Sequence, residues 1–240
     1  MKCANNILID NPTCIDADSV SIQRKGHLII ASCTFSSARF NDKHFNMLDI
    51  AFPSMLNKAV AKRKSEFLAG RYLAKIIMKH LQFQDKNIGI NEHKAPVWPQ
   101  ELLGSITHSR ETAHCVITKL QSHKYIGIDV EHWLSTEDAN SLMNNIVSDQ
   151  NEYQILLPYI NFEQAITLIF SAKESLYKAI FKEFEHYVDF HVAKVTKVNF
   201  NTRLLTLTLC QDLSKKMYSG REFICQFNFC KQSVTTLISD

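Results

Sequence analysis

Two acidic residues that lie two positions apart give the first sign of chemistry in this 240-residue chain. In residues 126–131 (IGIDVE), apolar residues alternate with Gly127, Asp129 and Glu131, which is the period of a strand with one buried and one polar face. Asp129 and Glu131 therefore point the same way, so that one should be protonated or both should bind a cation. Gly127 leaves that face open to an approaching ligand. The pattern suits a hard divalent metal with phosphate ligands; the alternative is an edge strand with two solvated acids.

A second group of charged residues lies in 170–179 (FSAKESLYKA), within a helical pattern of apolar residues. Glu174 and Lys178 are four residues apart and share one face of this helix, and Lys173 directly precedes Glu174. An exposed pair with this spacing is usually a weak surface salt bridge. Because small residues surround the pair, a ligand could come close, and the segment is a second candidate for the site.

Positive charge is concentrated in residues 57–81, where a helical stripe of apolar residues is accompanied by basic side chains and the single acid Glu66. The basic residues are Lys58, Lys62, Arg63, Lys64, Arg71, Lys75, Lys79 and His80. The imbalance suggests an anionic ligand, although a solvated basic face is the simpler explanation. His108 lies between two small hydroxyl residues in 104–109 (GSITHS), so its imidazole can reach a phosphate or a reacting group, or can bond to the backbone of a turn.

These residues are expected on the helices and strands of an α+β protein. The first half runs strand 26–35, a loop and short helix within 36–56, helix 57–81, and strands 104–109 and 112–120 joined by a turn at 110–111. The second half begins with strand 126–131 and short helices 135–145 and 148–157. A longer helix follows from Asn161 to about residue 185, with Gln164 in a capping box. The half ends in a meander of strands 187–200, 203–210, 222–229 and 233–238. Each half holds a long helix and short strands, and the halves are predicted as residues 1–123 and 124–240.

The composition narrows the class of protein. The 45% apolar and 21% charged content is ordinary for a soluble globular protein, and a formal net charge of +3 is too small to indicate a nucleic-acid partner. The seven cysteines form no C-x-x-C pair, which fits reduced thiols in a cytoplasm. Residues 1–16 lack the pattern of a secretory signal, and no apolar stretch is long enough to span a membrane. We therefore expect a cytoplasmic protein that binds neither a membrane nor nucleic acid.

The motifs, taken in order, resemble those of the 4′-phosphopantetheinyl transferase superfamily, and within it the larger monomeric type of the surfactin and enterobactin-synthase-component-D kind. The segments that carry the resemblance are 63–71 (RKSEFLAGR), 94–99 (KAPVWP), 104–109 (GSITHS), 127–131 (GIDVE) and 170–179 (FSAKESLYKA). Each is weak alone, but five in family order are a specific signal. The first two look more like the enterobactin branch than the surfactin branch.

The resemblance implies a pseudo-duplicated fold of two α+β halves, each a small antiparallel sheet packed on a long helix, with coenzyme A in the cleft between them. It implies a monomer that transfers the phosphopantetheine arm of coenzyme A to a serine of an apo acyl, peptidyl or aryl carrier protein in the presence of Mg²⁺, releasing adenosine 3′,5′-bisphosphate. The carriers would belong to siderophore synthases or to other secondary-metabolite or polyketide-type synthases.

The resemblance also assigns roles to residues of this chain. Asp129, Glu131 and Glu174 match the metal ligands, with Glu131 binding directly or through water. Arg63, Arg71, Lys94 and His108 match the residues that hold the coenzyme A phosphates, although Ala95 replaces the lysine that precedes the proline in the surfactin-type pattern. Lys173 and Lys178 would stabilise the transferring phosphoryl group and the leaving phosphate. Either Glu174 or a metal-bound water would take the serine proton.

Two other functions use some of the same residues. A Mg²⁺-dependent nuclease also needs carboxylates and a lysine, but it usually carries an E-x-K on a strand soon after the aspartate, whereas the lysine–glutamate run here is predicted on a helix. A non-catalytic module that binds coenzyme A or a carrier protein could dispense with the acids. All three acids, His108 and both lysines are present, which favours the enzyme.

Overall fold

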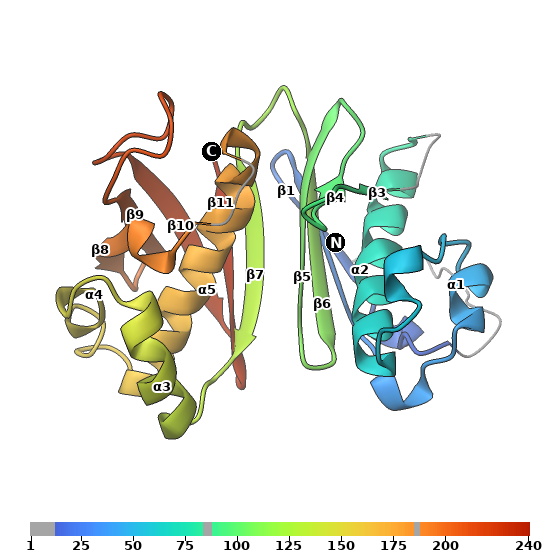
Figure 1. The fold of residues 1–240 in the computed structure, drawn as a ribbon, viewed down its shortest axis with the longest axis horizontal. Helices are drawn as coiled ribbons and strands as arrows, with labels where there is room; N and C mark the ends of the chain where they lie inside the picture. Colours follow the sequence, from blue (N-terminus) through green and yellow to red (C-terminus); the bar gives the residue numbers. More distant parts are fainter. Residues whose placement is uncertain (1–12, 84–87, 185–187) are drawn as a thin grey trace.

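The computed structural model of the chain describes residues 13–83, 88–184 and 188–240 (Figure 1). Two antiparallel sheets meet in the middle of the molecule. The first sheet has the order β1 (Ser21–Lys25), β2 (Leu28–Thr34), β6 (Thr112–Lys119) and β5 (Leu102–Ser109). The second has the order β7 (Ile126–His132), β11 (Ser233–Ser239), β10 (Glu222–Phe229), β9 (Leu204–Leu209) and β8 (Ala193–Asn199).

Each sheet is covered by one long helix, and this confirms the predicted α+β class with two similar halves. Helix α2 (Ala61–His80) packs on the first sheet and α5 (Phe162–Ile180) on the second. The smaller elements are α1 (Lys43–Met47), α3 (Thr136–Ile146), α4 (Asn151–Gln154) and a hairpin of β3 (Gly89–Ile90) and β4 (Pro96–Val97). The predicted boundary between residues 123 and 124 lies in the connection from β6 to β7.

The start of α5 follows the predicted capping box. The Asn161 side chain accepts a hydrogen bond from the Gln164 backbone N–H at 2.9 Å, and the Gln164 side chain accepts one from the Asn161 N–H at 3.4 Å. The helix ends at Ile180 and continues as a 3-10 turn over Phe181–Glu183, so the prediction that it reaches residue 185 was too long. Residue 185 and residue 187, where the meander was predicted to begin, lie outside the described residues.

The predicted helix 148–157 is shorter than expected. Ser148 does not cap it: its hydroxyl donates to the Ala193 carbonyl at 3.3 Å and accepts from the Lys173 ammonium at 3.4 Å, while the Asn151 N–H donates to Asp149 at 2.9 Å. Helix α4 covers only Asn151–Gln154. The sequence also gave no indication of β1, since this edge strand is mostly exposed and lacks an apolar face.

None of the described helices is long and apolar enough to cross a membrane. In the described ranges all cysteines are free thiols, and Cys3 lies outside those ranges.

Candidate active site

The acidic strand β7 is the edge of the second sheet, and it lies beside β5, the edge of the first (Figure 1). Ile126 and Ile128 pack with Leu103 and Val116 in an apolar cluster between the two sheets. The face that carries Asp129 turns the other way, toward α5, and Asp129 is only 2% exposed. The alternative of two solvated acids is therefore wrong: the face that carries Asp129 is polar in composition, but both faces are buried over most of the strand.

Gly127 sits against helix α5, which fills the space that the sequence suggested for a ligand. A Cβ at Gly127 would lie 1.9 Å from the Ser175 carbonyl oxygen and 2.8 Å from the Ala179 nitrogen. The missing side chain thus lets the strand and helix backbones touch. This close approach brings the Glu174 and Lys178 face of α5 alongside the acids of β7.

Lys178 and Asp129 form the central ion pair. The Lys178 ammonium lies 2.6 Å from Asp129 Oδ1 and also donates to the Ile128 carbonyl at 3.3 Å. Thr107, on β5, donates its hydroxyl to the same Oδ1 at 2.8 Å. The other oxygen, Oδ2, is buried and has no hydrogen-bond partner in the described part of the chain. A buried, unpartnered carboxylate oxygen is costly, which marks this atom as a position for a ligand.

The other two acids interact electrostatically with Asp129. Burial and the neighbouring Asp129 charge raise the pKa of Glu131 to about 7, against the opposing effects of a hydrogen bond from Ser109 and of Lys178. Burial also raises the pKa of Glu174, while Lys178 lowers it and Asp129 raises it further. The protein thus gathers three carboxyl groups whose combined negative charge is only partly balanced by one lysine.

The carboxylates suit a hard cation by their chemistry, although their arrangement is not that of a formed centre. Over the described ranges, no cluster of three or more His, Cys, Asp or Glu side chains already has the arrangement of a metal-binding group. The donors are oxygen atoms, one of them has no partner, and the ionised forms of two acids are disfavoured by burial. A bound Mg²⁺ would compensate each of these features, so the residues fit the ion.

His108 lies on the opposite face of β5, toward α2. Its Nε2 is 3.0 Å from Arg63 Nη1, and its Nδ1 is 3.7 Å from Glu66 Oε2. Because a guanidinium only donates, Nε2 accepts this bond and the proton of the neutral ring is on Nδ1, facing Glu66. Burial lowers the pKa of His108, Glu66 opposes this effect, and Arg63 and Lys178 lower the pKa further. Glu66 Oε2 also lies 3.4 Å from Arg63 Nη1, so the histidine, the arginine and the glutamate form one connected group, and His108 is within electrostatic range of Lys178.

Arg71 lies deeper, about two helical turns after Arg63 on α2. It is 9% exposed, donates from Nη2 to the Gly89 carbonyl at 3.2 Å, and places its guanidinium 4.8 Å from the Phe67 ring centre. Its buried Nε has no hydrogen-bond partner among the described residues, and burial lowers the pKa of Arg71 to about 10, so it stays charged at neutral pH. Lys94 lies in the β3–β4 loop with a left-handed backbone, at φ 64°.

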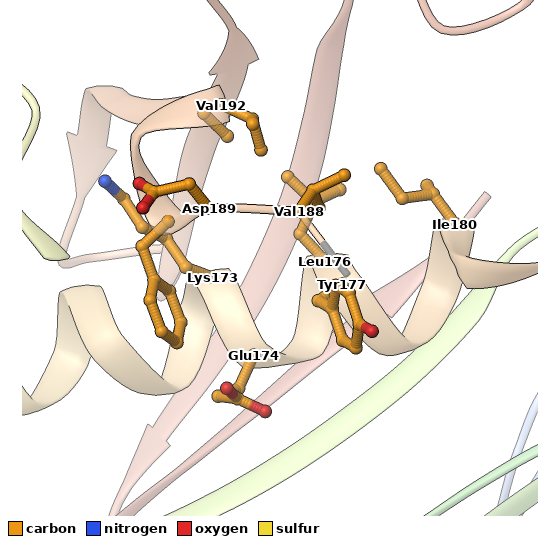
Figure 2. A pocket seen from close by; sticks show the side chains of 10 residues that line it. Lys173, Glu174, Leu176, Tyr177, Ile180, Val188, Asp189 and Val192 are labelled. Carbon is orange, nitrogen blue, oxygen red and sulfur yellow. The ribbon is translucent and has the colours of Figure 1, made fainter. Parts of the chain in front are cut away.

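The Lys173 ammonium pairs with Glu152 and not with Asp129, Glu131 or Glu174. Figure 2 shows its side chain and that of Glu174 leaving α5 in different directions. The Lys173 ammonium is buried, 3.0 Å from the Glu152 carboxylate and 2.5 Å from the Ile146 carbonyl oxygen. Glu152 in turn accepts from the Val195 N–H at 2.9 Å. This network joins α5 to α3, α4 and β8, and the sequence-based assignment of Lys173 to the coenzyme A phosphates finds no support in its position.

An apolar pocket opens beside Glu174 (Figure 2). It contains about 430 Å³ of space, including its open mouth. Its walls are Leu176, Tyr177, Ile180, Val188, Phe190, Val192 and Ala193, and its polar end is formed by Lys173, Glu174 and Asp189. Glu174 therefore belongs both to the acidic group and to the wall of this pocket.

Thr107 and Glu152 are site-related residues that sequence reasoning missed. Thr107 could have been noticed, because residues 105, 107 and 109 of a strand share one face and all three carry hydroxyls. Glu152 gave no such signal, since its partner Lys173 comes from another helix.

Comparison with known proteins matches both halves of the chain to one family. Residues 52–118 match the model of the 4′-phosphopantetheinyl transferase N-terminal domain, and residues 125–228 match that of the 4′-phosphopantetheinyl transferase superfamily.

Individual relatives belong to the same family. The chain is 38% identical over 175 residues to enterobactin synthase component D of Salmonella typhimurium (strain LT2), which covers 72% of this chain and 70% of the relative. It is 36% identical over 145 residues to the protein of that name from Escherichia coli (strain K12), covering 60% and 67%. It is also 28% identical over 142 residues to the 4′-phosphopantetheinyl transferase Npt of Nocardia iowensis, covering 59% and 63%.

Proposed function

The chain belongs to the 4′-phosphopantetheinyl transferase superfamily and is an enzyme that acts on coenzyme A and an apo carrier protein, and we propose that it uses Mg²⁺ held by Asp129, Glu131 and Glu174. The observation that carries the proposal is the buried Oδ2 of Asp129, which has no hydrogen-bond partner among the residues that the structure describes and lies near two further acids. When bound there, the ion would neutralise charge on the coenzyme A pyrophosphate.

In the proposed reaction, the oxygen of the carrier serine forms a bond to the phosphorus next to the pantetheine arm, and the bond from that phosphorus to the bridging oxygen breaks. The products are the holo-carrier and adenosine 3′,5′-bisphosphate. Glu174, or a water held by the ion, would take the serine proton. The Lys178 ammonium, 25% exposed, stabilises charge that develops on the phosphoryl oxygens.

The first half of the chain would hold the adenosine end of coenzyme A. Arg63 and His108, which contact each other, would bind the pyrophosphate, and Arg71 and Lys94 would bind the 3′-phosphate. The pantetheine arm would run along the apolar pocket beside Glu174, because Glu174 belongs both to this pocket and to the acidic group. Lys173 is assigned to the structural network with Glu152 instead of to the phosphates.

The relatives named enterobactin synthase component D support carriers of siderophore-type synthases as the substrates. We also propose that residues 1–123 and 124–240 are the two halves and that the enzyme acts as a cytoplasmic monomer. The sheets, which fall on either side of the β6–β7 connection, support the division.

Intact-mass spectrometry tests the function. The protein is incubated with coenzyme A, Mg²⁺ and separate apo acyl, peptidyl and aryl carrier proteins. We expect at least one carrier to gain the mass of the phosphopantetheine arm, and EDTA to abolish the gain. Unmodified carriers in all three reactions would contradict transfer, whereas modification that persists in EDTA would contradict only the role of the metal.

A further inference from the structure

The two facing edge strands are joined by side-chain hydroxyls. Strands β5 and β7 belong to different sheets, and three alternating residues of β5 reach across to β7. The Ser105 hydroxyl accepts from the Ile128 N–H at 3.1 Å, and the Ser109 hydroxyl donates to Glu131 at 3.2 Å. Thr107 lies between them. Because residues two apart on a strand share a face, this row follows from the strand period once β5 and β7 are neighbours.

Only one assignment of donors and acceptors fits the hydrogen bonds of the Thr107 hydroxyl. It lies 3.1 Å from the Lys178 ammonium and 3.4 Å from the Val130 N–H, and both of these groups only donate. A hydroxyl has two acceptor positions and one proton, so both acceptor positions are taken and the proton must go elsewhere. It points to Asp129 Oδ1, 2.8 Å away. Thr107 therefore cannot turn its proton away from Asp129 without losing a bond.

The consequence for Asp129 is that its two oxygens differ. Oδ1 receives hydrogen bonds from Thr107 and from Lys178 at 2.6 Å, while the buried Oδ2 has no partner within the described residues. Rotation of the carboxylate would exchange the two oxygens, and it is opposed by both bonds. The free oxygen is thus held in one direction by a residue of the other sheet.

We propose that Thr107 is a positioning residue, whose hydroxyl holds Asp129 with its free oxygen directed toward the cation site. This inference rests on the proposed function, in which Asp129 binds Mg²⁺. The cation site would then depend on both sheets, because the metal-binding residue Asp129 lies on β7 and the residue that orients it, Thr107, lies on β5. Groups that orient a metal ligand typically affect metal affinity by about 10- to 100-fold.

The test compares the Mn²⁺ affinity of three variants. Titration of each protein–coenzyme A complex with Mn²⁺ is followed by the electron paramagnetic resonance signal of free Mn²⁺, and coenzyme A alone is the blank. Thr107→Val removes the hydroxyl at nearly constant volume, and Thr107→Ser keeps it. Ser105→Ala is the matched control, because it removes a hydroxyl of the same row that bonds to backbone and not to an acid. Thermal melts establish that each variant folds. If Thr107→Val does not fold, Thr107→Ala takes its place.

We expect Thr107→Val to weaken Mn²⁺ binding about 10- to 100-fold and to raise the half-saturating Mg²⁺ concentration of transfer in parallel, with the KM for the carrier unchanged. Thr107→Ser and Ser105→Ala should bind Mn²⁺ within about threefold of the wild-type affinity, as expected where the orienting hydroxyl remains.

Equal Mn²⁺ affinity in Thr107→Val and Ser105→Ala would overturn the proposal, and so would failure of both the valine and alanine variants to fold. If the wild type transfers nothing yet the Mn²⁺ pattern holds, the proposed function fails and the role of Thr107 stands.

Discussion

The Lys178 ammonium lies 2.6 Å from Asp129 Oδ1 and joins helix α5 to strand β7. The aspartate side chain is 3% exposed and the lysine side chain 25%, so the pair has a buried end and a solvent-facing end. The lysine satisfies one carboxylate oxygen, and the other has no hydrogen-bond partner among the described residues. The pair thus leaves one oxygen of Asp129 available for a ligand.

Replacement of Asp129 by alanine should abolish transfer without unfolding the protein. The acid is needed for the cation, and the exposed end of Lys178 can be solvated when its partner is lost. We expect a fall of at least about 100-fold in kcat/KM, since loss of a ligand should exceed the effect of groups that only orient one. Intact-mass assays give the rate and a thermal melt shows the fold. Retained transfer at saturating Mg²⁺ would remove Asp129 from the site.

Gly127→Ala should be strongly destabilising. The new Cβ would overlap the Ser175 carbonyl oxygen at 1.9 Å, and because this is backbone it cannot move aside without shifting α5. Overpacking of a core typically costs about 1–3 kcal/mol, and a clash with backbone should reach or exceed the upper end. Urea denaturation measures the change. Gly26→Ala is not a suitable control because its backbone is left-handed at φ 58°. An unchanged midpoint for Gly127→Ala would show that α5 does not pack on β7 this closely.

Lys173→Met should destabilise the protein by about 3–5 kcal/mol, because it leaves the buried Glu152 carboxylate without its cation. The double variant Lys173→Met/Glu152→Leu should recover part of this loss. Denaturant titrations give both values. If the double variant is stable but has a greatly raised KM for coenzyme A, Lys173 binds the phosphates after all and the structural assignment is wrong.

Arg71→Lys should raise the KM for coenzyme A by about 10- to 100-fold, since hydrogen bonds to a charged group contribute about 1.5–3 kcal/mol and lysine lacks the planar fork of arginine. Dephospho-coenzyme A, which lacks the 3′-phosphate, provides the control. Wild type and variant should have similar KM values for it if Arg71 binds that phosphate. An equal loss with both substrates would place Arg71 elsewhere on the ligand.

Stability below neutral pH should depend on His114, whose pKa is lowered to about 4 by burial against the opposing effect of Asp129. The unfolded chain binds the proton near pH 6.5, so the stabilisation is present above that pH and is lost as pH falls toward 4. The loss is up to about 3 kcal/mol, at 1.36 kcal/mol per pKa unit. His114→Asn should lose correspondingly less stability over this range in urea titrations. Parallel pH profiles for the two proteins would contradict this.

Local features of this chain could be predicted from its sequence because they depend on neighbours within one element. The capping box of Asn161 and Gln164, the long basic helix and the shared face of Asp129 and Glu131 all follow from periods of 3.6 and 2 residues. The motif order was likewise enough to indicate the family that both family models match.

Contacts between elements could not be read from the sequence. Gly127 suggested room for a ligand, but α5 fills it; Lys173 stands next to Glu174, but its ammonium meets Glu152 on another helix. Thr107 acquires its role only because the edges of two sheets face each other. The chain alone determined which chemical groups are present and which face of an element each one occupies. Only the tertiary structure decided which groups meet, because packing joins segments whose separation along the chain leaves no periodic signal.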